Sequence, residues 1–156
     1  MKLNLIASYK NINIGFSGTQ EGMSHEQLKQ FFLLMQLFSP KVIEFHHGSC
    51  IGSDTEAHCL VNDHFPHIEI YIHPCDINSK RVSLSGHWVY NPKPPLVRNR
   101  IIVDQTDILI ATPKEDEEVL RSGTWSTIRY ARKKEKSVII VSPGGDLHFS
   151  RTVYNR

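Results

Sequence analysis

Short apolar segments alternate with longer amphipathic segments along most of this chain. Five of the apolar segments have the length and composition of buried β-strands: residues 12–16, 42–46, 68–73, 108–111 and 138–141. The segments between them are too long for hairpin turns and carry apolar residues at helical spacing, so we expect successive strands to run parallel. The pattern therefore predicts an α/β fold with a parallel sheet of about five strands.

Two serine-containing motifs predict where helices begin. Ser24 is followed three residues later by Gln27, and Ser53 is followed by Glu56 at the same spacing. Such pairs are typical of capping boxes, in which each side chain binds the backbone N–H of the other residue. We therefore expect helices to start directly after Ser24 and Ser53.

The first of these helices carries a stripe of large apolar residues at helical spacing: Leu28, Phe31, Phe32, Met35 and Phe38. Such a stripe is typical of a helix face that packs into the protein core. Because its phenylalanines offer more apolar surface than one helix face normally needs, we also expect self-association. A homodimer with two-fold symmetry is the simplest form.

The rest of the chain gives weaker signals. Residues 1–10 fit either an N-terminal extension or an edge strand, and residues 11–156 are expected to form one domain. Residues 74–95 contain several prolines and no periodicity, which is typical of a long binding loop or lid. Trp88 and Tyr90 in this loop would either stack on a base or pack the loop onto the protein body.

Residues 95–141 combine the features of a phosphate-binding unit. A short helix with Arg98 and Arg100 precedes one predicted strand, and the turn at residues 121–124 leads into a helix and the next strand. In such a unit the turn lies at the carboxyl edge of the sheet, where backbone N–H groups and the helix dipole attract anions. The two arginines point about 200° apart on a helix, so only one of them can face this edge.

Several motifs in this order resemble the DNA-processing protein A family and, more broadly, the SLOG superfamily, which includes the lonely-guy phosphoribohydrolases and nucleotide-sensing domains. They are RNRIIVDQTDILIA from residue 98, SGTWSTIRYA from residue 122, SVIIVSPGG from residue 137, and the segments at residues 15–20 and 46–58. The resemblance covers roughly residues 11–145. It implies a Rossmann-like three-layer sandwich that binds its ligand at the carboxyl edge of the sheet.

Eight residues are candidates for binding a ligand or its phosphate. All fall just past a predicted strand or at the start of a predicted helix, where open α/β sheets bind ligands. The resemblance favours Arg98 as the arginine that faces the ligand. The eight are Gly18, Thr19, Gly48, Asp54, Arg98, Ser122, Gly123 and Thr124.

The composition and the absence of certain motifs exclude several classes of ligand and cofactor. The net charge of +2 is too small to indicate nucleic-acid binding by itself, and no apolar run approaches the roughly 18 residues of a membrane span. Three cysteines form no recognisable disulfide framework, so we expect a cytoplasmic location. The loop at residues 15–19 completes neither a Walker A motif nor a Gly-x-Gly-x-x-Gly motif, so no redox dinucleotide cofactor is expected.

Histidines and cysteines near the predicted strand ends raise the question of a metal site. His47 and Cys50 have a ligand-like spacing, and His46, His58 and His73 lie near them in the predicted fold. The sequence contains neither a CxxC nor an HExxH motif, and scattered histidines are usually structural. We therefore expect no bound metal.

One position separates this chain from the phosphoribohydrolases that it resembles. In those enzymes a catalytic glutamate stands three residues after the threonine of the glycine–threonine turn, and here that position is Thr127. A threonine hydroxyl stays neutral and cannot act as a carboxylate base. Asp54 and Glu56 are the nearby carboxylates that would have to substitute, so the catalytic residues stay open.

The sequence therefore predicts a protein that binds a nucleotide or a nucleotide-derived phosphate at the carboxyl edge of the sheet. Two alternatives remain: an N-glycosidase acting on a nucleoside monophosphate, and a protein that binds single-stranded DNA. The basic segment at residues 129–136 would suit DNA, but cations in the last turn of a helix more often offset the helix dipole. The acidic residues 115–118 would partly cancel such a patch.

Overall fold

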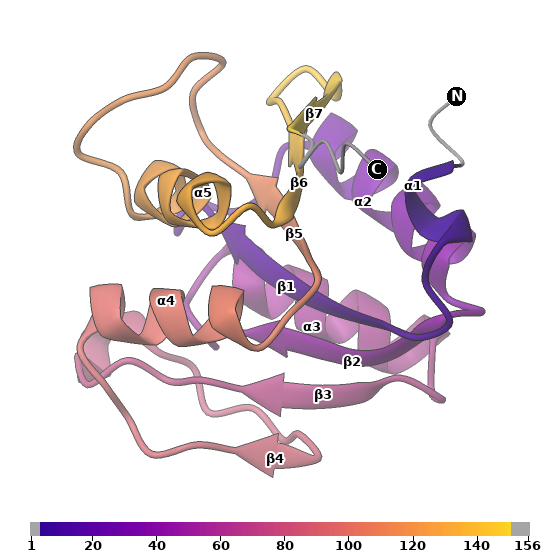
Figure 1. Cartoon of the computed structure of the whole chain (residues 1–156). Coiled ribbons are helices and arrows are strands. Elements are labelled where there is room, and N and C mark those ends of the chain that lie inside the picture. The colour runs from indigo at the N-terminus through magenta and orange to yellow at the C-terminus, as the bar shows by residue number, and fades with distance from the viewer. Residues whose placement is uncertain (1–3, 151–156) are drawn as a thin grey trace.

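The computed structural model describes residues 4–150, which form three layers (Figure 1). A central sheet has α2 and α3 on one face and α4 and α5 on the other, so the predicted three-layer α/β architecture is confirmed. The helices are α1 (Asn4–Ala7), α2 (His25–Phe38), α3 (Ser53–His64), the 3-10 turn η1 (Asn78–Lys80), α4 (Pro95–Asp104) and α5 (Gly123–Lys133). None of the helices within residues 4–150 has both the length and the apolar character needed to cross a membrane.

Five parallel strands form the centre of the sheet, in the order β3-β2-β1-β5-β6. These are the five strands that the sequence predicts, with ends that differ by one or two residues. Their bounds are β1 (Ile12–Gly18), β2 (Val42–His47), β3 (Glu69–Ile72), β5 (Ile108–Thr112) and β6 (Ser137–Val141). The order reverses between β1 and β5, which is the position where open α/β sheets form a ligand crevice.

The sheet has seven strands rather than the predicted five or so, because one further strand pairs at each edge. At one edge, β4 (Trp88–Val89) pairs parallel to β3, and at the other, β7 (Leu147–Ser150) pairs antiparallel to β6. A two-residue strand in a proline-rich loop leaves no alternating pattern in the sequence. Within residues 1–10, Asn4–Ala7 form the short helix α1 and not an edge strand, and residues 1–3 lie outside the described residues.

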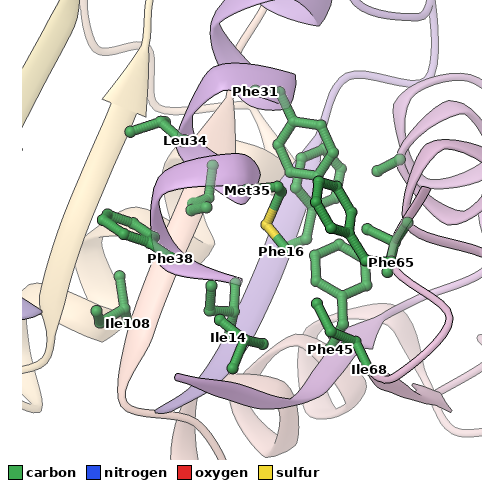
Figure 2. Close-up of a cluster of buried hydrophobic side chains, with 14 of the residues drawn as sticks. Ile14, Phe16, Phe31, Leu34, Met35, Phe38, Phe45, Phe65, Ile68 and Ile108 are labelled. Carbon is green, nitrogen blue, oxygen red and sulfur yellow. The ribbon is translucent and has the colours of Figure 1, made fainter. Parts of the chain in front are cut away.

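The larger of two hydrophobic cores lies between the sheet and the α2–α3 layer (Figure 2). The Phe16 ring lies 5.2 Å from that of Phe31 and 6.0 Å from that of Phe45. Phe31 and Phe38 are at most 2% exposed, and Phe32 packs against the ring of Phe65. The stripe on α2 is therefore used within this core, so the reason for expecting self-association was wrong. The homodimer stays a prediction without that support.

The second core fixes α5 on the opposite face of the sheet. Trp125, Ile128 and Ala131 from α5 are buried against Leu109 of β5 and Val138 of β6. Because these contacts hold the first turn of α5, its N-terminus is held at the carboxyl edge of the sheet.

The two predicted capping boxes have different outcomes. Ser24 and Gln27 form the complete box at the start of α2, as predicted. Gly52, not Ser53, is the N-cap of α3, and no side chain caps that helix. Ser53 instead donates its hydroxyl to the Thr19 carbonyl, at 2.7 Å. The prediction failed because this serine lies inside the helix, where its hydroxyl ties α3 to the loop after β1.

Candidate functional site

A cleft of about 400 Å³ lies at the carboxyl edge of the sheet, between the ends of β1 and β5. Its walls come from the loops after β1, β2 and β5, from the first turns of α3 and α5, and from one side of α4. All eight residues proposed from the sequence lie on this one cleft: Gly18, Thr19, Gly48, Asp54, Arg98, Ser122, Gly123 and Thr124. The structure therefore brings the whole set together, and their contact with a ligand is a proposal made below.

The floor of the cleft contains the buried carboxylate of Asp54. This side chain is 5% exposed, and its Oδ2 accepts backbone N–H bonds from Gly48 at 3.2 Å and from Cys50 at 3.1 Å. Burial raises the pKa of Asp54, while Arg98 and these two N–H groups act to lower it. Asp54 thus occupies the N–H groups of the β2–α3 loop that would otherwise be open to a ligand anion.

Arg98 connects three segments around this floor. Its Nη1 donates to the carbonyls of Gly48, at 2.8 Å, and His73, at 3.0 Å, while Nη2 donates to Cys50 Sγ at 3.3 Å and Nε to Asn99 Oδ1 at 2.7 Å. Four of the five guanidinium N–H groups are therefore used inside the protein. One N–H of Nη2 keeps no protein partner within residues 4–150. The sequence predicts Arg98 as the arginine that faces the ligand, but it does not predict these contacts within the protein.

Arg100, two residues further along α4, lies outside the cleft. Its guanidinium carbon stands 5.4 Å from the ring centroid of Tyr130, and the residue is exposed. Because the two arginines point to different sides of α4, a substitution of Arg100 serves as a control for a substitution of Arg98.

Two glycines of the set are needed for close packing. A Cβ at Gly48 would overlap the Arg98 guanidinium, and a Cβ at Gly18 would overlap Ser53 and Thr112. Neither glycine has a positive φ, so the requirement is for space and not for backbone freedom. These positions let the loops after β1 and β2 approach their neighbours closely.

The first turn of α5 presents backbone N–H groups to the cleft. Ser122 is the N-cap, and its hydroxyl oxygen accepts the N–H of Trp125 at 3.2 Å. The N–H groups of Gly123 and Thr124 have no partner among the described residues, as is usual at a helix start. A Cβ at Gly123 would meet nothing within 4 Å, so the approach to this turn is open. Such a helix N-terminus is a ready anion-binding site.

Charged side chains line the cleft, and of these only Arg98 and Asp54 are among the eight residues proposed from the sequence. The four cations on its wall are Lys80, Arg98, Lys114 and Arg121, and the three acids are Glu21, Asp54 and Glu115. Lys114 forms an exposed ion pair with Glu21 at 2.7 Å, which joins the loops after β5 and β1. Long polar loops have no periodicity from which these positions could be read, and only the folded arrangement identifies them.

The residues 74–95 contribute Lys80 to the cleft but not their aromatic rings. The Tyr90 ring stacks on that of His73, with centroids 4.4 Å apart, so it packs the loop onto the body. Trp88 is 57% exposed on β4 and does not line the cleft. Base stacking by these two residues in this cleft is therefore not supported.

Four buried histidines form two hydrogen-bonded pairs behind the site. His46 Nδ1 lies 2.8 Å from His73 Nε2, and His47 Nε2 lies 2.9 Å from His58 Nδ1. Burial lowers the pKa of each ring, and it lowers that of His73 to about 3. Within residues 4–150, no three histidine, cysteine or acidic side chains are arranged to hold a metal ion. His46 Nε2 also lies 2.7 Å from the Glu44 carboxylate, which acts to raise the pKa of that ring against the effect of burial.

The contacts of Arg98 predict a stability cost that Arg100 does not share. We expect Arg98→Ala to lower the free energy of unfolding by about 2–5 kcal/mol, because the buried carbonyls of Gly48 and His73 lose their donor and buried Asp54 loses a nearby positive charge. Arg100→Ala, on the same helix, should cost no more than about 1 kcal/mol, as expected for an exposed cation–π contact. Urea denaturation of both variants measures the difference, and equal costs would contradict the structural role of Arg98.

The histidine pairs predict a loss of stability on mild acidification. Unfolded histidine has a pKa of about 6.5, and the pKa values of His46, His47, His58 and His73 are lower in the folded state. Below that pH the unfolded chain therefore binds more protons than the folded chain. The contribution of these histidines to the free energy of unfolding is largest above about pH 6.5 and decreases as the pH falls. Asp54 acts in the opposite direction near its own range, because its pKa is raised by burial.

Chemical denaturation between pH 7.5 and 5 measures this slope. His73→Gln is expected to reduce it, and His148→Gln, which changes an exposed histidine on β7, serves as the matched control. A slope that is the same in the parent protein and His73→Gln would show that the His46–His73 pair does not control the acid response.

Comparison with known proteins supports the fold and leaves the ligand open. The sequence matches no known protein family and no curated protein. Among solved structures, the molybdenum cofactor binding protein from the phototrophic bacterium Rippkaea orientalis is 23% identical, with a TM-score of 0.66, over 86% of this chain and 78% of that one. DNA processing protein A from Helicobacter pylori is 17% identical, with a TM-score of 0.57, over 90% of this chain and 67% of that one.

A second DNA processing protein A, from Streptococcus pneumoniae, is 17% identical, with a TM-score of 0.62 over 84% of this chain, which spans half of that protein's length. At these identities the likeness is one of fold. The predicted resemblance to DNA-processing protein A is therefore confirmed at the level of the fold, and this chain has a Rossmann-like architecture.

Proposed function

We propose that this chain binds a nucleotide or a nucleotide-derived phosphate in the cleft at the carboxyl edge of the sheet, as a binding, sensing or sequestering protein. The observation that carries the proposal is the first turn of α5. Gly123 and Thr124, whose N–H groups have no partner among the described residues, line a cleft whose wall carries four cations and three acids. The three cysteines are free thiols, which supports a reducing, cytoplasmic location.

The phosphate of the ligand is placed at α5 because the other turn at this edge is already occupied. At the β2–α3 loop, the Asp54 carboxylate takes the N–H groups of Gly48 and Cys50. A second anion there would meet a buried negative charge. At α5 the helix dipole is favourable and no protein carboxylate caps the turn, since Ser122 provides the N-cap.

Binding without hydrolysis is favoured over the N-glycosidase alternative. Thr127, at the position of the catalytic glutamate, is 3% exposed, and its hydroxyl donates to the Gly123 carbonyl at 2.8 Å. It does not line the cleft. Glu56, one of the two possible substitutes, accepts the Met23 N–H at 2.6 Å and also lies outside the cleft lining. Only Asp54 remains of the two, and its Oδ2 already accepts two hydrogen bonds.

Single-stranded DNA is the second candidate, because the similar Helicobacter pylori protein binds it. The basic end of α5 gives this candidate less support, since three of its five cations have hydrogen-bond partners within the chain. Arg129 binds the Glu118 carboxylate and the Val119 and Leu120 carbonyls. Arg132 donates to Ser150 at 2.9 Å, and Lys136 donates to a backbone carbonyl. The fold likeness to a molybdenum cofactor binding protein likewise supports a binding role without choosing the ligand.

Adding a carboxylate at the start of α5 tests the phosphate position. We expect Gly123→Asp to weaken binding of adenosine monophosphate about 10-fold or more, because like charges about 4 Å apart repel by roughly 1–4 kcal/mol. The fold should be retained, since the new side chain has open space and acidic residues stabilise helix N-termini. Isothermal titration calorimetry measures the affinity.

Gly144→Asp is the matched control for this variant. It introduces the same charge at a glycine in the turn between β6 and β7, where a Cβ also meets nothing within 4 Å, and it lies outside the cleft lining. We expect this variant to bind like the parent protein. Equal affinities of Gly123→Asp and Gly144→Asp would remove the first turn of α5 from the site.

The position of Thr127 predicts no release of adenine from adenosine monophosphate. A missing general acid or base typically costs about 10²–10⁴-fold in rate, and the buried hydroxyl of Thr127 is already hydrogen-bonded to Gly123. Chromatography of the incubated nucleotide measures free adenine. Multiple turnovers that disappear in an Asp54→Asn variant would instead establish the N-glycosidase function.

A further inference from the structure

Asn99 stands next to Arg98 on α4, and the contact between the two side chains fixes which way the Asn99 amide points. Arg98 Nε lies 2.7 Å from Asn99 Oδ1. A guanidinium nitrogen can only donate a hydrogen bond, so the amide atom that faces it has to be the oxygen. The amide nitrogen of Asn99, Nδ2, is therefore turned away from Arg98 Nε and carries two N–H groups.

The amide nitrogen of Asn99 is open to a ligand. Asn99 is half-buried and lines the cleft together with Arg98. No residue that the structure describes accepts a hydrogen bond from Nδ2. In the described part of the chain, the shielded side-chain atoms without a partner belong to Thr112, Glu115 and Trp125. Because Nδ2 is not one of them, solvent reaches it, and a bound ligand can reach it as well.

Asn99 also lies beside the first two turns of α5. A second hollow, of about 310 Å³, runs between α4 and α5, and Asn99 lines it together with Ser126 and Thr127. Asn99 lines both this α4–α5 groove and the cleft, so it stands at the border between them. That border is next to the N-terminus of α5, where the phosphate of the ligand is proposed to bind.

The hydrogen-bond donors around Asn99 define the kind of group that fits there. The two N–H groups of Nδ2 belong to the same cleft as one N–H of Arg98 and the N–H groups of Gly123 and Thr124. The nearby carboxylate of Asp54 already accepts two backbone N–H groups. An ionised phosphate offers only acceptor oxygens, so it is matched by such a set of donors.

We propose that Asn99 is a phosphate-binding residue, which donates from Nδ2 to an oxygen of the ligand's phosphate while its Oδ1 holds Arg98. The two roles use opposite ends of one amide, which is why an asparagine suits this position. The inference rests on the proposed function, because it requires a phosphate in the same cleft. It adds a donor from α4, so that the phosphate is held between α4 and the first turn of α5.

Asn99→Asp separates the two ends of the amide because it changes only one of them. Aspartate has nearly the same shape and keeps an oxygen for Arg98 Nε, but a second, negatively charged oxygen replaces the donor. We expect the affinities for adenosine monophosphate and for inorganic phosphate to fall about 100-fold or more, because a hydrogen bond is lost and a repulsion is added. Isothermal titration calorimetry measures both affinities. The midpoint of thermal unfolding should equal or exceed that of the parent protein, since Arg98 gains an ionic partner.

Asn99→Ala removes both ends of the amide. Its affinities for the two ligands are expected to fall less, by about 10- to 100-fold, because the donor is lost without a new charge. Its midpoint of thermal unfolding should decrease, because Arg98 Nε loses its acceptor. The aspartate variant is thus expected to bind more weakly than the alanine variant and to be more stable, an order that a purely structural role of Asn99 would not produce.

Ser126→Asp is the control for the added charge. Ser126 lines the α4–α5 groove with Asn99 but does not line the cleft. A carboxylate at this position leaves the Asn99 amide in place, and water and salt screen its charge, so both affinities are expected to fall less than about 5-fold. A loss as large as that of Asn99→Asp would show that charge alone explains the result, and the role of Asn99 would be overturned.

Three other results also overturn the proposal. If Asn99→Asp binds like the parent protein while Asn99→Ala is weakened, Asn99 only positions Arg98. If Asn99→Ala binds like the parent protein, the amide donates nothing to the ligand. If adenosine monophosphate is weakened and inorganic phosphate is not, the amide contacts another part of the nucleotide.

Failure of the proposed function gives a different result. If the parent protein binds neither adenosine monophosphate nor inorganic phosphate, the proposed function itself is wrong, and the role of Asn99 falls with it. Each of the results that concern Asn99 alone leaves phosphate binding by the parent protein in place, so the two failures are distinguishable.

Discussion

The guanidinium of Arg98 is the group on which the arrangement of the carboxyl edge depends. It is 5% exposed, and a buried cation is tolerated only when its N–H groups have acceptors. The Gly48 and His73 carbonyls and Cys50 Sγ provide them, which ties α4 to the loop after β2 and to the end of β3. Because Asp54 is buried beside these groups, each charge lowers the cost of burying the other.

The Arg98–Asp54 region and the segment after β5 have different roles in the cleft. Since the Arg98–Asp54 region satisfies most of its own polar groups, it shapes the cleft more than it offers contacts to a ligand. Besides one N–H of Arg98, the N–H groups of Gly123 and Thr124 on the segment after β5 have no partner among the described residues. The segment that carries these two N–H groups is held at its ends by the core and by ion pairs.

The same architecture serves different ligands because its contact groups lie on loops and helix ends. The solved structures of similar fold include a molybdenum cofactor binding protein and a protein that binds single-stranded DNA. In this chain the hydroxyl of Thr127 donates to the Gly123 carbonyl within its own helix. The fold therefore sets where a ligand binds, and a few side chains at the sheet edge decide which ligand it is and whether it reacts.

The sequence by itself determined the five central strands, their parallel direction and the set of eight residues that share one cleft. It could do so because apolar periodicity reports burial, and because parallel strands place their following loops at one edge. Only the tertiary structure decided how Arg98 is used, that Ser53 ties α3 to the Thr19 loop, and that Glu115 lies on the cleft wall. These depend on contacts between residues far apart in the chain, which leave no local pattern. The edge strand β4 was missed because pairing with β3, and not an alternation of its own, makes it a strand. In β7, Leu147 and Phe149 do alternate with polar residues, but over only four residues.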